Sequence, residues 1–127
     1  MLSPKKKLLL VDDDQSQLNL RKSILEHSGY EVFTATDARN GMQVFKAQAP
    51  DAVVLDYEIP RINSGVLAGI IRRANYAVPI VMLSGCASIP VSALRRVNRF
   101  IPKATAPTVL IQTLERLTSD RLEEAVA

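Results

Sequence analysis

Two apolar runs in the sequence are each followed by aspartate. Residues 8–11 lead into three consecutive aspartates at 12–14, and residues 52–55 lead into Asp56. A strand without polar alternation is covered on both faces, as in a parallel sheet between helices, so the residue that follows it lies at the carboxyl edge of the sheet. Carboxylates gathered there repel one another unless a cation lies among them or one of them is modified. Oxygen ligands at strand ends favour Mg²⁺, which usually accompanies phosphate chemistry.

The length and composition indicate one globular domain. A chain of 127 residues can bury roughly two thirds of its unfolded surface, and 47% hydrophobic with 23% charged residues exclude intrinsic disorder. We expect a single domain over 1–127, with a basic lead at 1–6 and a polar tail at 119–127. No apolar run reaches the roughly 18 residues that cross a bilayer, and the lone Cys86 can form no internal disulfide. We therefore expect a cytoplasmic protein that does not bind membranes.

Acidic and basic residues are unevenly distributed along the chain. The formal net charge is +3, and five arginines lie away from the aspartate run, namely Arg72, Arg73, Arg95, Arg96 and Arg99. This distribution predicts two faces of opposite charge. No DNA-binding motif surrounds these arginines, so we interpret them as solvated helix faces and expect no direct binding of nucleic acid.

Strand-like and helix-like segments alternate. Five apolar strands are predicted at 7–11, 31–36, 52–56, 80–84 and 99–102. Each is followed by a segment that is helical or permits a helix, which is the alternation of an α/β protein. The first helix is predicted at about 16–28, with Leu18, Leu25 and also Ile24 buried, and Gly29 is predicted to end it.

The later helices are predicted from caps, prolines and apolar spacing. Asp37 is a predicted N-cap for a helix that Pro50 closes. A third helix is predicted at about 64–74, with Val66, Ile70 and, secondarily, Leu67 directed inward. In the segment 85–98 only Val91, Leu94 and Val97 have helical spacing, which predicts a short helix. The last helix is predicted to begin near Pro107 and to bury Leu110, Leu114 and Leu117.

Five parallel strands with helices on both faces predict a flavodoxin-like (βα)5 doubly wound sheet, strand order 2-1-3-4-5. In that order the switch point, where such sheets bind ligands, lies between the first and third strands. Asp12 and Asp13 follow the first strand and Asp56 ends the third. The topology therefore predicts that these acids meet in one crevice.

Two further side chains are predicted at the same edge. Ser84 ends the fourth strand and supplies a hydroxyl, and Lys103 follows the fifth and supplies an ammonium. Together these groups suit an acyl phosphate on one aspartate. Mg²⁺ and lysine neutralise a phosphoryl group of nearly two negative charges, while serine and backbone amides donate hydrogen bonds to its oxygens.

With these residues in this order, the sequence resembles the receiver domain of two-component response regulators, of the chemotaxis-regulator type, over about residues 5–117. The resemblance depends on segments 8–14 and 53–56, on Ile59 and Pro60, on Ser84 with Gly85, and on segment 100–103. Each segment alone is weakly specific, whereas their order and spacing together are strongly specific.

The resemblance implies that Asp56 accepts a phosphoryl group from a sensor histidine kinase or a phosphotransfer protein. It implies a Mg²⁺ ion bound by Asp12, Asp13, Asp56 and the backbone carbonyl of Glu58. Such a domain is a signalling module that catalyses its own phosphorylation and slow dephosphorylation. The Glu58 side chain is expected near the water that hydrolyses the acyl phosphate.

The resemblance also implies a switch. Ser84 and Lys103 would contact the phosphoryl group, and Phe100 would change rotamer as Ser84 moves inward, altering a surface for a downstream protein target or an effector domain. A phosphorylation-dependent dimer is compatible with this scheme. Phe100 can also be an ordinary core residue, and an aspartate at 12–14 can simply cap the next helix; Asp14 receives no direct role.

Three details depart from the family pattern. Gly65 lies one position later than the family's glycine, which predicts a lengthened loop before it. Ala104 stands where the family usually has proline, which predicts a freer loop after Lys103. The stretch from Ser84 to Lys103 is shorter than usual, which predicts a trimmed fourth helix beside the output surface.

Two alternative functions stay open from the sequence. Residues 12–16 also match the nucleophile motif of haloacid-dehalogenase-like phosphatases, in which Asp12 would be the nucleophile. That fold needs a further acidic pair at a strand tip, whereas Asp120, Glu123 and Glu124 lie in a predicted polar helix. The other alternative is a receiver-like module that binds partners without being phosphorylated.

Overall fold

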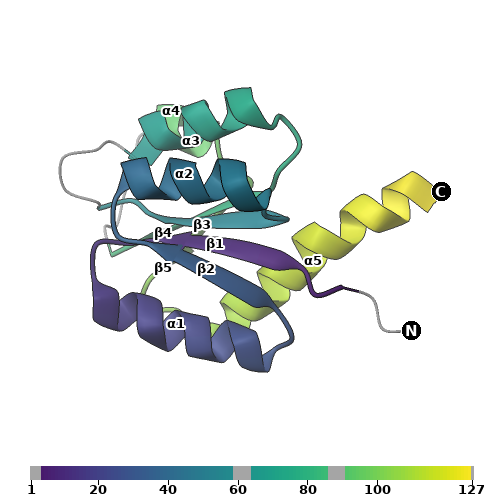
Figure 1. Cartoon of the computed structure of the whole chain (residues 1–127), viewed down its shortest axis with the longest axis horizontal. Helices are drawn as coiled ribbons and strands as arrows, with labels where there is room; N and C mark the ends of the chain where they lie inside the picture. The colour runs from purple at the N-terminus through teal and green to yellow at the C-terminus, as the bar shows by residue number, and fades with distance from the viewer. Residues whose placement is uncertain (1–3, 59–63, 86–90, 127) are drawn as a thin grey trace.

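The computed structural model describes residues 4–58, 64–85 and 91–126, in which five strands alternate with five helices (Figure 1). The strands are β1 (Lys7–Val11), β2 (Glu31–Ala35), β3 (Ala52–Asp56), β4 (Ile80–Ser84) and β5 (Arg99–Pro102). The helices are α1 (Gln15–His27), α2 (Ala38–Gln48), α3 (Ser64–Ala74), α4 (Val91–Leu94) and α5 (Pro107–Val126). The predicted lengthened loop, with Ile59 and Pro60, and the expectation for Cys86 lie outside the described residues.

All five strands are parallel, in the order β2-β1-β3-β4-β5. Helices α1 and α5 cover one face of the sheet, and α2, α3 and α4 cover the other (Figure 1). The predicted flavodoxin-like architecture is thus confirmed. Four strands have the predicted bounds, and β2 ends one residue earlier than predicted, at Ala35.

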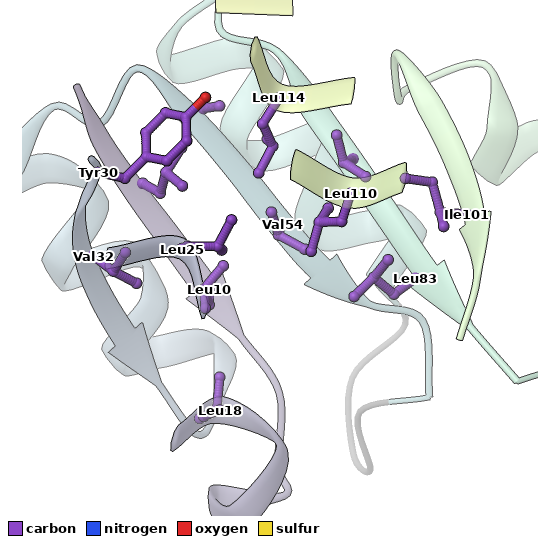
Figure 2. Packing of buried hydrophobic residues seen from close by; sticks show 13 residues of the cluster. Leu10, Leu18, Leu25, Tyr30, Val32, Val54, Leu83, Ile101, Leu110 and Leu114 are labelled. Carbon is purple, nitrogen blue, oxygen red and sulfur yellow. The ribbon is translucent and has the colours of Figure 1, made fainter. Parts of the chain in front are cut away.

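Alternate residues of the strands enter two separate cores. Leu8 and Leu10 of β1 face α1 and α5, while Leu9 and Val11 face α2 and α3. On the first face, Leu110 and Leu114 of α5 pack over Val54 (Figure 2). Because both faces are covered, the three central strands β1, β3 and β4 contain no polar alternation, as the sequence predicted.

The helix ends follow local chemistry. Asp14 caps α1 by accepting a hydrogen bond from the Gln17 amide at 3.2 Å, and Asp37 caps α2 as predicted. Gly29 has a φ of 99°, the left-handed conformation that ends a helix readily only with glycine or asparagine. Helix α4 is one turn long, which agrees with the predicted short helix, and α5 continues as a helix to Val126, through most of the predicted polar tail.

The predicted inward face of α3 is correct for Leu67 and wrong for Val66 and Ile70. Val66 and Ile70 are 52% and 45% exposed, whereas Leu67, Ala68 and Ile71 are buried. Both sets have helical spacing, so periodicity alone could not choose between them. Leu67, Ala68 and Ile71 pack in one core with Val53 and Leu55 of β3, and this packing decides the rotation of the helix.

Candidate functional site

The strand register brings the carboxyl ends of β1, β3, β4 and β5 to one edge. Val11 pairs with Leu55, so the next residues, Asp12 and Asp56, are neighbours. The backbone ladder continues past the strands, because the Tyr57 amide donates to Leu83 at 2.8 Å and the Lys103 amide donates to Ser84 at 2.9 Å. These bonds fix the backbone from which each candidate side chain extends.

Asp12, Asp13 and Asp56 form an acidic cluster at this edge. One carboxylate oxygen from each lies within 4.8 Å of the others. Asp12 and Asp56 are 2% and 3% exposed, and Asp13 is open to solvent. Buried carboxylates this close suit a divalent cation with oxygen ligands, so the residues present fit the predicted Mg²⁺ ion.

An arginine that the sequence analysis did not identify touches this cluster. Nη1 of Arg21, on α1, donates to Oδ2 of Asp12 at 2.8 Å, and Oδ1 of Asp12 accepts from the Asp14 amide at 3.0 Å. A signal was present in the sequence. Arg21 falls between Leu18 and Leu25 on the buried stripe of α1, where a charged residue needs a partner.

Lys103 lies between two carboxylates. Its Nζ is 3.0 Å from Oδ1 of Asp56 and 3.3 Å from Oε2 of Glu58. The same Oδ1 atom accepts a hydrogen bond from the Glu58 amide at 3.1 Å. The predicted approach of Lys103 to the acidic cluster is therefore observed.

The Glu58 side chain crosses from β3 to the end of β4. Its Oε1 accepts from Oγ of Ser84 at 2.8 Å and from the Gly85 amide at 2.9 Å. The Ser84 hydroxyl, the Gly85 amide and the Lys103 ammonium, which all contact this one carboxylate, are called the donor group below. Ser84 is fully buried at the end of β4, which is the position that the sequence predicted for its hydroxyl.

The charges of the site perturb one another. Burial raises the pKa of Asp56, and the hydrogen bonds from Glu58 and Lys103 do not offset burial and the neighbouring Asp12. Burial also acts on Asp12, but the hydrogen bond from Asp14, with Asp56, Arg21 and Lys103, holds its pKa below the usual value. Burial opposes the charge of Lys103, yet Asp56, Asp12 and Glu58 raise its pKa.

Two other residues support or flank the site. Ser64, fully buried at the start of α3, donates from Oγ to the carbonyl of Asp56 at 2.6 Å, a contact that the sequence analysis missed. It fixes the peptide that follows the phosphoacceptor candidate. Phe100 is half-buried on β5, beside Met82 in the register.

Two of the five arginines interpreted as solvated make hydrogen bonds to neighbouring segments. Arg72 donates to the Val78 carbonyl and to Asn98, and Arg96 donates to the Gly65 carbonyl at 2.9 Å. Both are more than solvated side chains, because they join α3 to the segments beside it.

Among the described residues, no helix is long and apolar enough to span a bilayer.

Comparison with known proteins agrees with this geometry. The family model of the response regulator receiver domain matches residues 8–115. PhoP of Bacillus subtilis, the alkaline phosphatase synthesis transcriptional regulatory protein, is 35% identical over 79 residues, which are 62% of this chain and 33% of PhoP. The probable transcriptional regulator ycf27 of Cyanophora paradoxa is 33% identical over 85 residues, 67% of this chain and 35% of that protein. The chain spans about a third of the length of these curated relatives.

Solved structures share the fold. A CheY-like response regulator receiver domain protein from Methanospirillum hungatei has a TM-score of 0.90 and 26% identity, covering 95% of this chain and 99% of that one. NtrX from Brucella abortus has a TM-score of 0.87 and 32% identity, covering 97% of this chain and 29% of NtrX. The chain belongs to the response regulator receiver domain family.

Proposed function

We propose that this domain accepts a phosphoryl group on Asp56 from a phosphohistidine of a sensor histidine kinase or a phosphotransfer protein. The observation on which the proposal depends is the position of Asp56. Its buried carboxylate lies beside Asp12 and Asp13 and 3.0 Å from Nζ of Lys103, with the Ser84 hydroxyl at the next strand end.

Each side chain has a distinct part in the proposed transfer. A carboxylate oxygen of Asp56 attacks phosphorus, a P–O bond forms, the P–N bond to histidine breaks, and the imidazole leaves with its electron pair. Asp12, Asp13, Asp56 and the Glu58 carbonyl would hold Mg²⁺, which neutralises charge on the phosphoryl oxygens when bound. Ser84 and Lys103 would donate to those oxygens.

The donor group gives Glu58 a different part from the one expected. Its carboxylate accepts from the same groups that the phosphoryl oxygens would need, so a phosphoryl group on Asp56 has to displace it. The cost of the displacement is limited, because Glu58 is 36% exposed at its side chain and can turn to water. Glu58 therefore acts first as a substitute anion in the resting protein.

The consequence of phosphorylation is proposed by analogy with the relatives. Movement of Ser84 and Phe100 would alter a surface for a downstream protein target or an effector domain, with a phosphorylation-dependent dimer as one form of that output. The domain would work in the cytoplasm as a single receiver domain, without contacting nucleic acid or membrane itself.

A phosphodonor assay tests the proposal. Incubation with acetyl phosphate and Mg²⁺ is expected to add one phosphoryl group, detected by intact mass, that hydroxylamine removes and that Asp56→Asn does not acquire. Rapid release of inorganic phosphate that is lost in Asp12→Asn would instead indicate a phosphatase. The absence of both an adduct and turnover would indicate a module that only binds partners.

A further inference from the structure

The contact between Arg21 and Asp12 has no part in the phosphoryl transfer described above. Arg21 comes from α1, and its side chain is only 14% exposed, with its Nη1 on Oδ2 of Asp12 at 2.8 Å. The other Asp12 oxygen already accepts the Asp14 amide at 3.0 Å. Both oxygens of this carboxylate therefore have a donor before any metal ion arrives.

We propose that Arg21 is a built-in counterion that competes with Mg²⁺ for Asp12 and so sets the Mg²⁺ concentration at which the domain becomes competent. The inference rests on the proposed function, because it concerns the metal of that same site. Arg21 is a positioning residue here, since it acts through Asp12 and not on the phosphoryl group.

Two effects of Arg21 on the metal oppose each other. The hydrogen bond holds Asp12 in one orientation, which favours binding, while the guanidinium places a positive charge beside the oxygens that a dication must approach. Repulsion between a single and a double charge a few ångströms apart in a partly buried site exceeds the benefit of fixing one short side chain. The net effect is weaker Mg²⁺ binding.

The rest of the cluster does not cancel this effect. Lys103 lies on Asp56, so the second cation near the cluster is on a different carboxylate. Asp13 is solvent-exposed, and no ion pair with it is found among the described residues. Asp12 is thus the ligand whose availability Arg21 controls.

Titration of the unphosphorylated protein with MgCl₂, followed by calorimetry at constant ionic strength, tests the proposal without any phosphodonor. Arg21→Gln removes the charge and retains length, and it is expected to bind Mg²⁺ about tenfold more tightly than the wild type. Arg21→Lys retains the charge and is expected to stay within about twofold of the wild type. Lys22→Gln removes one positive charge from the same helix and serves as the matched control, because Lys22 forms no ion pair within the part of the chain that the structure describes.

Several outcomes would overturn the proposal. One is equal or weaker binding by Arg21→Gln than by the wild type, and another is a gain of the same size in Arg21→Lys or Lys22→Gln. Circular dichroism without metal checks that the variants are folded. If wild type and Arg21→Gln both fail to bind Mg²⁺, the metal role of Asp12 fails as well. If the wild type binds and the Arg21 variant is unchanged, only the Arg21 inference fails.

Discussion

In the acidic cluster, Asp12 and Asp56 each contact one cationic side chain. In the donor group, by contrast, the hydroxyl, the amide and the ammonium all contact one carboxylate, that of Glu58. The cluster contains three acids against Arg21 and Lys103, so its negative charge is only partly neutralised. The donor group is already satisfied by an internal anion. A cation therefore binds the cluster mainly by addition, against repulsion from Arg21, whereas a phosphoryl group binds the donor group by exchange with Glu58.

Lys103 is the residue that belongs to both halves, and its removal is expected to have the largest effect on them. Lys103→Gln loses a charge-assisted contact to any phosphoryl group, worth about 1.5 to 3 kcal/mol, or roughly 10- to 150-fold in affinity. The measurement is binding of beryllofluoride, a phosphoryl analogue, with Mg²⁺ by NMR. Lys46→Gln, an exposed lysine in the last turn of α2, is the control. Affinity unchanged in Lys103→Gln would show that the ammonium does not reach the phosphoryl position.

Glu58→Gln tests whether a phosphoryl group has to displace the Glu58 carboxylate while Mg²⁺ does not. The amide oxygen can still accept from Ser84, but it loses its charge, so the donor group is held less tightly and is released at lower cost. Beryllofluoride is expected to bind about three- to tenfold more tightly, the size of one hydrogen bond of ordinary strength. The same variant is expected to leave Mg²⁺ affinity within twofold, because the Glu58 carboxylate contacts Ser84, Gly85 and Lys103 and the proposed metal ligand from this residue is its backbone carbonyl. Glu26→Gln, exposed on α1, is the control.

If Glu58→Gln binds the analogue more weakly, Glu58 is not a competitor for the donors. The two halves of the site would then bind their ligands in the same way, because neither ligand would have to displace Glu58. A weaker adduct in the variant would also indicate that the Glu58 carboxylate helps to hold the metal.

The sequence predicted the strand-end residues of both halves by one argument. Asp12, Asp13 and Asp56 directly follow strands, and strand order follows from βα alternation, so their meeting needed only topology. Ser84 and Lys103 were located by the same argument. The fold was predictable for the same reason, since uninterrupted apolar strands require two covered faces.

The features that the sequence did not predict depend on the rotation of a helix about its axis and on the rotamers of long side chains. Val66 and Ile70 of α3 were wrongly predicted to face inward because Val66 with Ile70 and Leu67 with Ile71 have the same spacing, and only packing against the sheet separates the two pairs. The partners of Arg21 and Glu58 depend on where long side chains turn. The buried stripe of α1 indicates that Arg21 needs a partner, but only the structure shows which groups Arg21 and Glu58 reach.

The incomplete neutralisation of the acidic cluster predicts a stability effect, smaller than the effects on binding. Burial and Asp12 raise the pKa of Asp56 in the folded protein, so folding disfavours its charged form. This penalty is absent below the unfolded pKa, where both states are protonated, and is complete above the folded pKa. Asp56→Asn is therefore expected to stabilise the metal-free protein by an amount that grows as pH rises from 4 and then levels off.

Thermal unfolding in chelator between pH 4 and 8 measures this difference. Two carboxylates about 4 Å apart repel by about 1 kcal/mol even in water, which for a domain of this size is roughly 3 to 6 °C in Tm. Asp37→Asn removes a carboxylate at an exposed N-cap where asparagine caps equally well, and it is expected to show no such pH-dependent gain. Added Mg²⁺ is expected to reduce or reverse the advantage of Asp56→Asn, because a cation stabilises the wild-type cluster more than the variant. If the gain in Tm of Asp56→Asn is independent of pH, or if Mg²⁺ leaves it intact, the acidic cluster is already neutral without metal. The cluster would then resemble the donor group, whose charge is already balanced by a partner within the protein.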